Sequence, residues 1–244
     1  MARFCALLSG GKDSNYALYR ALMEGMEPSC ILVVFPRRDD SWMFHTVNVS
    51  IAPLQAKAMG LGDKVVTVKV SGRKEEEVKE LEAALARAKE ERGFDTIVVG
   101  AIASRYQYQR IKGIADRLGV EVYAPLWGAN QEEYLRSLVR EGFVFIITRI
   151  STAGLPSNYL GKPVTKEVVE EIIERARRYS LNPSLEGGEG ETAVIDAPHY
   201  KQKVCIKALK ESITEFEHNL VIEEAWLAPK ETKLDKCITV RKTR

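Results

Sequence analysis

The 244-residue sequence has no apolar run long enough to span a membrane, and its first residues do not have the pattern of a signal peptide. It also lacks a dominant charge, because 36 Lys and Arg residues face 34 Asp and Glu residues. A net charge of +2 provides no bulk attraction to nucleic acid. We therefore expect a cytoplasmic protein with no membrane partner and no stable nucleic-acid partner.

Cysteine is scarce, and no C-x-x-C pair occurs among Cys5, Cys30, Cys205 and Cys237. This spacing favours a structural role for all four over a metal or redox role. Cys5 and Cys30 fall inside predicted strands, where a buried thiol acts as a small hydrophobe. With 45% hydrophobic and 29% charged residues, the composition excludes disorder and allows a substantial core.

The segment that follows the first apolar run has the features of a phosphate site. Phe4 to Leu8 are apolar and predict a buried strand, and Ser9, Gly10 and Gly11 then predict a tight turn. A helix over 14–23 would offer unpaired N–H groups and a positive dipole end to an anion. Lys12 adds a full positive charge at the same place.

Two common phosphate motifs do not fit this segment. A Walker A loop would need Gly at Ala6 and Ser or Thr at Asp13, and the dinucleotide fingerprint would need a third glycine. The string S-G-G-K-D-S at 9–14 instead resembles the pyrophosphate loop of the N-type ATP pyrophosphatases. That resemblance implies that ATP is split at the α phosphate into AMP and pyrophosphate.

Strands and helices alternate over the first part of the chain. This alternation predicts βαβ units and a parallel sheet, an α/β Rossmann-like fold of the adenine nucleotide α-hydrolase type. We assign it to a nucleotide-binding domain over 1–150. Ligands bind beyond the carboxyl ends of such strands, so the loops at 9–13, 36–41 and 100–104 should converge. The predicted strands are 30–35, 65–70, 96–99 and 120–123, and the predicted helices are 52–60, 75–92 and 109–118.

The pattern changes beyond about residue 150. Thr165 is a plausible N-cap for a helix over 166–179, and extended segments follow at 192–196, 203–209 and 213–228. Strands grouped after a helix predict a smaller α+β substrate domain over 151–244.

Three further segments allow two interpretations each. Residues 41–46, with His45, either line an adenine pocket or substrate wall, or pack under the edge of the first domain. Residues 100–107, with Arg110, either contact a ligand or begin a solvated helix. Residues 186–192 gather three carboxylates among three glycines, which fits either a cation or basic partner, or a flexible acidic turn.

Taken together, five motifs resemble the diphthine–ammonia ligase family. They are S-G-G-K-D-S at 9–14, S-W-M-F-H-T-V at 41–47, G-A-I-A-S-R-Y-Q at 100–107, P-L-W at 125–127 and E-G-G-E-G-E-T at 186–192. The resemblance runs from Phe4 to about Pro198. The chain departs from it at Gly190, where relatives often carry an aromatic residue, and this leaves the shape of the acceptor pocket open.

The resemblance implies the last step of diphthamide synthesis on translation elongation factor 2. ATP would adenylate the carboxylate of diphthine, a modified histidine, and ammonia would displace AMP to leave an amide. It therefore implies ATP and Mg²⁺ as cofactors and the diphthine-bearing factor and ammonium as partners. The sequence leaves a homo-oligomer open.

The resemblance also assigns roles to residues by their motif positions. Lys12 with the N–H groups of the two loop glycines would stabilise the departing pyrophosphate, Asp13 would hold magnesium, and the glutamates would hold ammonium or the trimethylammonium of diphthine. The predicted catalytic residues are Lys12, Asp13, Glu186 and Glu189; the nucleotide-binding residues are Ser9, Gly10, Gly11, Lys12, Asp13, Ser14, Gly100 and Ser104; and the substrate-binding residues are His45, Tyr106, Arg110, Glu191 and Thr192.

Two other functions stay open at this point. A different ATP pyrophosphatase, such as a tRNA-modifying enzyme, often carries catalytic cysteine pairs or an RNA-binding domain, and neither is evident in the sequence. A non-catalytic ATP or AMP sensor does not require both Lys12 and Asp13 beside a second acidic loop.

Overall fold

The computed structural model describes residues 1–37 and 49–242 and divides into two compact units, Met1–Gly128 and Ala129–Arg244. The boundary therefore lies after Gly128 rather than after residue 150. The reason is that the segment 144–151 forms a strand that pairs with strands of the second unit, so the pairing partners rather than the local sequence decide where the division falls.

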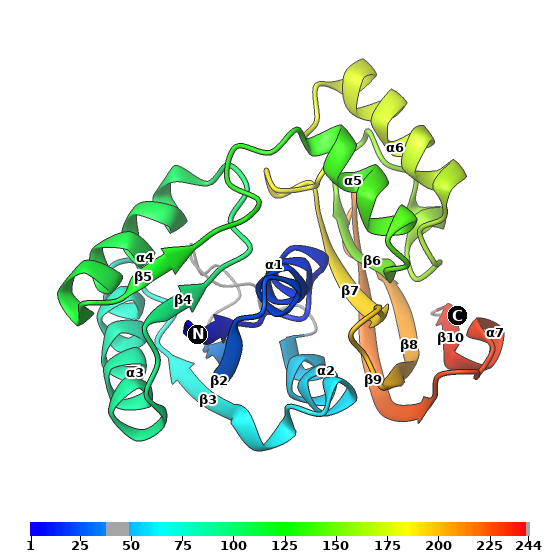
Figure 1. Ribbon diagram of the computed structural model, residues 1–244. Coiled ribbons are helices and arrows are strands. Elements are labelled where there is room, and N and C mark those ends of the chain that lie inside the picture. Colours follow the sequence, from blue (N-terminus) through cyan, green and yellow to red (C-terminus); the bar gives the residue numbers. More distant parts are fainter. Residues whose placement is uncertain (38–48, 243–244) are drawn as a thin grey trace. The chain divides into compact units, whose positions relative to one another are not determined.

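The first unit is a five-stranded parallel sheet with helices on both faces (Figure 1). The strand order is β3-β2-β1-β4-β5, which is the order of Rossmann-like folds and confirms the predicted fold class. The chain reverses its direction of winding between β1 and β4, and in such sheets the ligand binds at that point. The strands are β1 (Arg3–Leu7), β2 (Glu27–Pro36), β3 (Val65–Val70), β4 (Thr96–Val98) and β5 (Glu121–Tyr123).

Four helices cover this sheet. Helices α3 and α4 lie on one face, and α1 and α2 lie on the other (Figure 1). In α3, Val78, Leu81 and Leu85 recur at helical spacing and pack with Ile111 and Ile114 of α4 in one buried cluster. The helices are α1 (Lys12–Met23), α2 (Ala52–Met59), α3 (Glu76–Arg92) and α4 (Arg105–Leu118), with short 3₁₀ turns at Val49–Ile51 and Gly62–Lys64.

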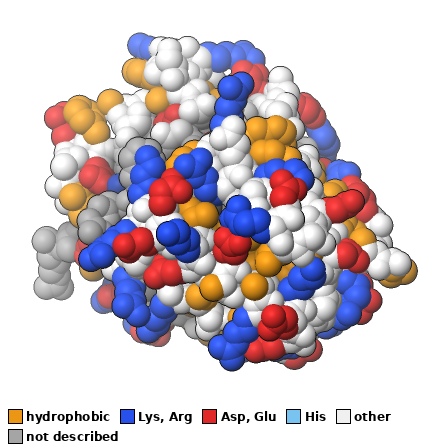
Figure 2. Space-filling model, turned by 90° about the vertical axis from the view of Figure 1, so that its left-hand side faces the viewer, with side chains coloured by type: hydrophobic (Ala, Val, Ile, Leu, Met, Phe, Trp, Pro, Cys, Tyr) orange, Lys and Arg blue, Asp and Glu red, His pale blue; other side chains and the backbone are white. Residues whose placement is uncertain are grey.

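The outer surfaces of α3 and α4 carry charges of both signs. Arg117 pairs with Glu82 at 2.7 Å, and Lys112 pairs with Asp116 at 2.6 Å. In Figure 2, which views the molecule from the side of these helices, Lys and Arg side chains are interspersed with Asp and Glu side chains. Positive and negative side chains are thus mixed on this face, as they are in the sequence as a whole. None of the helices within 1–37 and 49–242 has the length and apolarity that crossing a membrane requires.

The second unit is a mixed five-stranded sheet in the order β10-β8-β9-β6-β7. Its neighbours pair antiparallel except β10, which runs parallel to β8. The strands are β6 (Val144–Ser151), β7 (Gly190–Asp196), β8 (Gln202–Ser212), β9 (Glu217–Pro229) and β10 (Ile238–Lys242), and the helices are α5 (Gln131–Arg140), α6 (Lys166–Tyr179) and α7 (Leu234–Cys237), with a 3₁₀ turn at Ser157–Tyr159. Thr165 caps α6, as its sequence predicted, by accepting a hydrogen bond from the N–H of Val168.

The cysteines divide into two pairs. Cys5 and Cys30 are buried neighbours in the register of β1 and β2 and are free thiols, and burial raises the pKa of Cys5 well above its usual value. Cys205 in β8 and Cys237 at the end of α7 form a disulfide across 32 residues, which the sequence did not predict. The disulfide joins the chain just ahead of β10 to the strand on which β10 pairs.

We expect loss of the disulfide to lower the free energy of unfolding by about 3 kcal/mol, because the bond removes loop-closure entropy from the unfolded chain. The measurement is urea unfolding of the wild-type protein with and without reductant. A Cys205→Ala, Cys237→Ala double variant is the control, since reductant should leave it unchanged. Equal unfolding midpoints for the oxidised and the fully reduced wild type would contradict the expectation.

His199 is a buried titratable group in the loop between β7 and β8. Its ring lies 5.8 Å from the ring of Phe143 and 5.1 Å from that of Tyr200, measured between centroids. Burial, and then the positive charge of Lys230, lower the pKa of His199 to about 3. In the unfolded chain the same imidazole titrates near its usual pKa of about 6.5.

His199 should make the fold sensitive to acid. Between about pH 6.5 and pH 3 the unfolded chain binds a proton that the folded protein does not, so stability that is present above pH 6.5 is lost as the pH falls, at roughly 1.4 kcal/mol per unit. Unfolding free energies of the wild type and His199→Phe, measured from pH 7 to pH 4, should differ in slope by about one proton. Parallel slopes would show that this imidazole is not the cause.

Candidate active site

The loop between β1 and α1 is held by two buried amide side chains. Gly10 has a φ of +92°, a conformation that side chains with a Cβ rarely adopt. Gln55 Nε2 donates to the carbonyl of Gly10 at 2.9 Å, and Asn15 Nδ2 donates to the carbonyl of Gly11 at 2.9 Å. Asn15 Nδ2 also donates to Gln55 Oε1 at 3.2 Å, and both side chains are fully buried.

This anchorage fixes the direction of the loop's N–H groups. In a planar trans peptide the C=O and N–H groups point to opposite sides. Since the carbonyls of Gly10 and Gly11 face Gln55 and Asn15, the N–H groups of Gly11 and Lys12 point away from them. Neither amide was among the predicted site residues. Gln55 stands out as a polar residue in the apolar start of α2, whereas Asn15 follows the polar residues 12–14 and gives no such signal.

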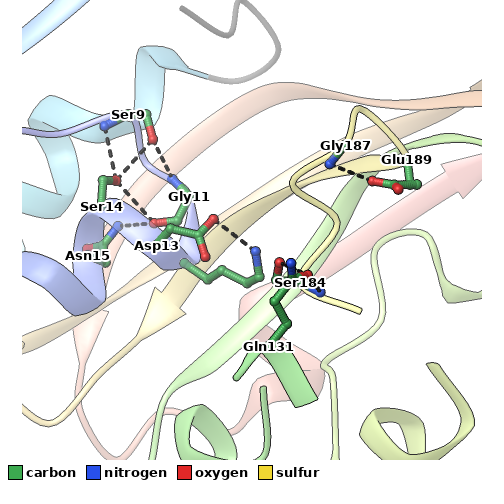
Figure 3. Close-up of polar contacts among 10 residues, drawn as sticks. Ser9, Gly11, Asp13, Ser14, Asn15, Gln131, Ser184, Gly187 and Glu189 are labelled. Atoms are coloured by element: carbon green, nitrogen blue, oxygen red, sulfur yellow. Dashed lines mark hydrogen bonds and ion pairs between the residues drawn. The ribbon is translucent and has the colours of Figure 1, made fainter. Parts of the chain in front are cut away.

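The two serines of the motif lie together. Ser9 Oγ and Ser14 Oγ are 3.0 Å apart, and the N–H of Ser9 donates to Ser14 Oγ at 3.1 Å (Figure 3). Ser14 Oγ also donates to the carbonyl of Gly11 at 3.2 Å, and the N–H of Gly11 makes a longer contact of 3.4 Å with Ser9 Oγ. The hydroxyls thus line the same turn as the glycine N–H groups.

Lys12 and Asp13 place opposite charges in the first turn of α1. The ammonium of Lys12 donates to Asp13 Oδ2 at 2.9 Å, and the Lys12 side chain is 3% exposed. A buried ammonium requires such a counter-charge. Among residues 1–37 and 49–242 there is no group of three His, Cys, Asp or Glu side chains that would hold a metal alone. Mg²⁺ is usually bound by one or two carboxylates together with phosphate oxygens and water, and Asp13 places one carboxylate in the first turn of α1.

The segment after β4 touches this loop. A Cβ on Gly100 would lie 2.5 Å from the carbonyl carbon of Asp13 and 2.6 Å from the nitrogen of Ser14, so only glycine allows the approach. Two of the three loops predicted to converge therefore do meet. Ser104 acts as the N-cap of α4, where its Oγ accepts from the N–H of Gln107 at 3.4 Å. The helix thus begins four residues before the predicted position.

Of the third loop, at 36–41, only residues 36 and 37 are described. His45 and the S-W-M-F-H-T-V motif also lie outside the described residues. The P-L-W motif lies within them, and Trp127 stacks on Tyr108 of α4 with 4.3 Å between ring centroids.

Tyr106 and Arg110 form a cluster with Glu75, which was not among the predicted site residues. Arg110 Nη2 lies 2.6 Å from Glu75 Oε1, and its guanidinium carbon lies 4.1 Å from the centre of the Tyr106 ring. The hydrogen bond from Arg110 lowers the pKa of Glu75, and the same bond raises the pKa of Arg110. The start of α4 is therefore charged, and the side chains of Tyr106 and Arg110 contact each other and Glu75 rather than extending separately into solvent.

In the second unit, a carboxylate closes the acidic loop between α6 and β7. Glu189 Oε1 accepts from the N–H of Asn182 at 2.9 Å and from its Nδ2 at 2.8 Å. Glu189 Oε2 accepts from the N–H of Gly187 at 2.7 Å (Figure 3). A Cβ on Gly187 would lie 2.3 Å from Asn182 Nδ2 and 2.6 Å from Glu189 Oε1, so a larger residue there would displace these two side chains. Glu186 is half-buried in the same loop.

The base of this loop is tied to α5. Ser184 is fully buried, and its Oγ donates to Gln131 Oε1 at 2.7 Å. Gln131 Nε2 in turn lies 3.5 Å from Asn182 Oδ1. The loop between α6 and β7 is therefore held in one conformation by side-chain hydrogen bonds, which argues against its interpretation as a flexible acidic turn.

The last predicted residues lie on β7 itself. Glu191 Oε1 is 3.8 Å from Nη1 of Arg149, which also pairs with Glu217 at 2.6 Å. Thr192 lies opposite Ile147 in the register of β6 and β7. A Cβ on Gly190 would lie 2.7 Å from the carbonyl oxygen of Arg149, and this close approach suits the glycine that departs from the family pattern.

Comparison with known proteins places both units in one family. Residues 2–122 match the family model described as the diphthamide synthase N-terminal domain, and residues 130–227 match the diphthamide synthase C-terminal domain. A solved structure described as a predicted subunit of a tRNA methyltransferase from Methanocaldococcus jannaschii has a TM-score of 0.43 and 17% identity, covering 81% of this chain and 98% of its own. That likeness is too low to bear on activity.

Several relatives carry the name diphthine–ammonia ligase. The protein from Rattus norvegicus is 34% identical over 221 residues, which cover 84% of this chain and 82% of its own length. The one from Homo sapiens is 32% identical with the same coverage. The one from Schizosaccharomyces pombe is 28% identical over 82% of this chain but only 35% of its own length. On these matches, which run through both units, the chain belongs to the diphthamide synthase family.

Proposed function

We propose that this protein is a diphthine–ammonia ligase that uses ATP to amidate diphthine on translation elongation factor 2. The observation that carries the proposal is the match of both units, in order, to the two domains of one family, whose relatives bear that name. The phosphate loop supports it, because its N–H groups and Lys12 suit a reaction in which pyrophosphate departs. As an elongation factor is the substrate, we place the protein in the cytoplasm.

The reaction balances in two steps. An oxygen of the diphthine carboxylate attacks the α-phosphorus of ATP, the bond to the β-phosphate oxygen breaks, and pyrophosphate leaves. The nitrogen of ammonia then attacks the acyl carbon, the carbon–oxygen bond to AMP breaks, and a proton is lost from nitrogen. The products are the amide, AMP and pyrophosphate.

The first unit would bind and activate ATP. The N–H groups of Gly11 and Lys12 and the Lys12 ammonium would stabilise the charge that develops on the departing pyrophosphate. The hydroxyls of Ser9 and Ser14 would donate to phosphate oxygens. Bound Mg²⁺ would supply charge neutralisation between phosphate oxygens, and Asp13 is the residue that would hold it.

The second unit would bind the ammonium or a further part of the acceptor. Glu189 binds the N–H of Gly187, so the carbonyl of the preceding Glu186 points away from it and offers negative charge to a cation. Glu191 and Thr192 lie at the start of β7, directly after this loop. All three bonds of the Glu189 carboxylate are to its own loop, which favours a part in shaping the loop over a direct part in the chemistry.

The decisive experiment is mass spectrometry of the diphthine-bearing factor incubated with this protein, ATP and ammonium. Product made with heavy-nitrogen ammonium must be heavier than product made with ordinary ammonium by the isotopic difference, and AMP must form with it. If the factor stays unmodified and no AMP forms, the ligase proposal is wrong. AMP release that depends on tRNA instead would support a tRNA-modifying enzyme.

Replacing Lys12 should stop adenylation. Lys12→Ala removes the buried ammonium that would lie beside the phosphates, so AMP formation should fall by about a hundredfold or more. Lys112→Ala is the matched control, because it removes an exposed lysine that pairs with Asp116. AMP release is measured for both, and circular dichroism checks the fold. Wild-type rates in folded Lys12→Ala would contradict the role.

Replacing Glu189 should affect amide formation more than ATP binding. Glu189→Ala leaves three donors of the loop without their acceptor, so we expect amidation to fall about tenfold or more. Glu189→Gln keeps one acceptor oxygen, so its amidation rate should lie between those of the wild type and Glu189→Ala. Glu174→Ala, an exposed change on α6, is the control. An equal loss of nucleotide affinity would show that the loop serves neither acceptor nor ammonia.

A further inference from the structure

Glu75 holds a backbone conformation that stability alone does not explain. It is one of three non-glycine residues in the described chain with positive φ, at φ 65° and ψ −30°, directly before α3. Its carboxylate pairs with Arg110, but the two side chains are 55% and 30% exposed. An exposed ion pair adds little to folding stability, so it does not offset backbone strain of this kind. Strain of this sort is typical of functional sites.

The Tyr106 ring beside Glu75 attracts cations. The guanidinium carbon of Arg110 lies 4.1 Å from the ring centre and Lys74 Nζ lies 5.4 Å from it, within the range of cation–π contacts. The Tyr106 hydroxyl donates to Glu75 Oε1 at 3.4 Å. An aromatic face and a carboxylate therefore lie side by side, with a guanidinium against both.

A second carboxylate lies near enough to the ring to affect the pKa of Tyr106. Glu77 in the first turn of α3 is fully buried. The pKa of Tyr106 is raised first by burial and then by Glu75, and Glu77 contributes in the same direction. The surroundings of the ring thus combine the carboxylates of Glu75 and Glu77 with the guanidinium of Arg110 and the ammonium of Lys74.

The cluster lies on the segment that touches the phosphate loop. Gly100 packs against Asp13 and Ser14, and α4 begins at Arg105, directly before Tyr106. Glu75 follows β3, so both parts of the cluster come from loops beyond carboxyl strand ends, where ligands of such sheets bind.

We propose that Tyr106, Glu75 and Arg110 bind the zwitterionic end of diphthine. The Tyr106 ring and the Glu75 carboxylate take the trimethylammonium, and the Arg110 guanidinium takes the carboxylate. The inference rests on the proposed function and names the acceptor subsite within it. Without ligand, Glu75 and Arg110 pair with each other. When diphthine binds, Glu75 pairs with its trimethylammonium and Arg110 pairs with its carboxylate.

This subsite would bind the trimethylated amino group of diphthine in preference to an unmethylated one. A trimethylammonium donates no hydrogen bonds and spreads its charge over methyl groups, so an aromatic face with a nearby carboxylate suits it better than it suits a free amine. One carboxylate oxygen held by Arg110 leaves the other for attack on the α-phosphorus. Glu75 and Tyr106 determine specificity, and Arg110 orients the acceptor.

A small probe tests the subsite directly. The probe is N,N,N-trimethyl-2-aminobutyrate, followed through its methyl signal by saturation-transfer NMR, with 2-aminobutyrate as the unmethylated comparison. We expect Tyr106→Leu and Glu75→Gln to weaken binding about fivefold or more, and Tyr106→Phe, which keeps the ring, to retain it. Glu82→Gln is the matched control, because it breaks the ion pair that Glu82 of α3 forms with Arg117 of α4 at 2.7 Å.

Turnover separates this inference from the proposed function. With the diphthine-bearing factor, Tyr106→Leu should raise the KM for the factor about fivefold and leave the KM for ATP unchanged. If the wild type forms no amide but the probe pattern holds, the ligase proposal fails and the subsite stands. If the wild type turns over but Tyr106→Leu matches Glu82→Gln in probe binding and KM, the subsite is overturned. Failure of the wild type to bind the probe overturns it as well.

Discussion

The hydrogen bonds from two buried amide side chains to two glycine carbonyls determine which groups the loop of the first unit can offer to a ligand. Asn15 and Gln55 bind the carbonyls of the loop from within the helix layer, which turns the N–H groups of the loop outward. The charge of Lys12, the turn lined by the serines and the close approach of Gly100 all depend on that one backbone path. A loop with the same glycines but without the amides would have no fixed direction for its donors.

The loop of the second unit is built on the opposite principle. There a carboxylate, Glu189, binds backbone N–H groups, and this turns carbonyl oxygens outward. The first loop therefore presents donors, which suit phosphate, and the second presents acceptors, which suit a cation. The two glycine-rich motifs look alike as sequence, yet the side chain that anchors each one, amide or carboxylate, gives them opposite polarity.

Local sequence predicted what local interactions determine. The strand, glycine turn and helix of the first motif, the parallel alternation and the Thr165 cap need only neighbouring residues. Contacts across long separations were missed: Gln55 meets Gly10 over 45 residues, and Cys205 meets Cys237 over 32. The domain boundary moved for the same reason, because the partners of β6 are distant in sequence. Glu189 was expected as a catalytic group, but its bonds to Asn182 and Gly187 exist only in the folded loop.

The position of β10 affects how one copy of the protein can associate with another. β10 lies at the end of its sheet and covers the long edge of β8, and the disulfide between Cys205 and Cys237 secures it there. An uncovered strand edge is a template on which another chain pairs. The exposed positions of β10 include Arg241 and Lys242, and charged side chains discourage such pairing. The state of one sulfur–sulfur bond thereby bears on whether the protein stays dispersed at high concentration.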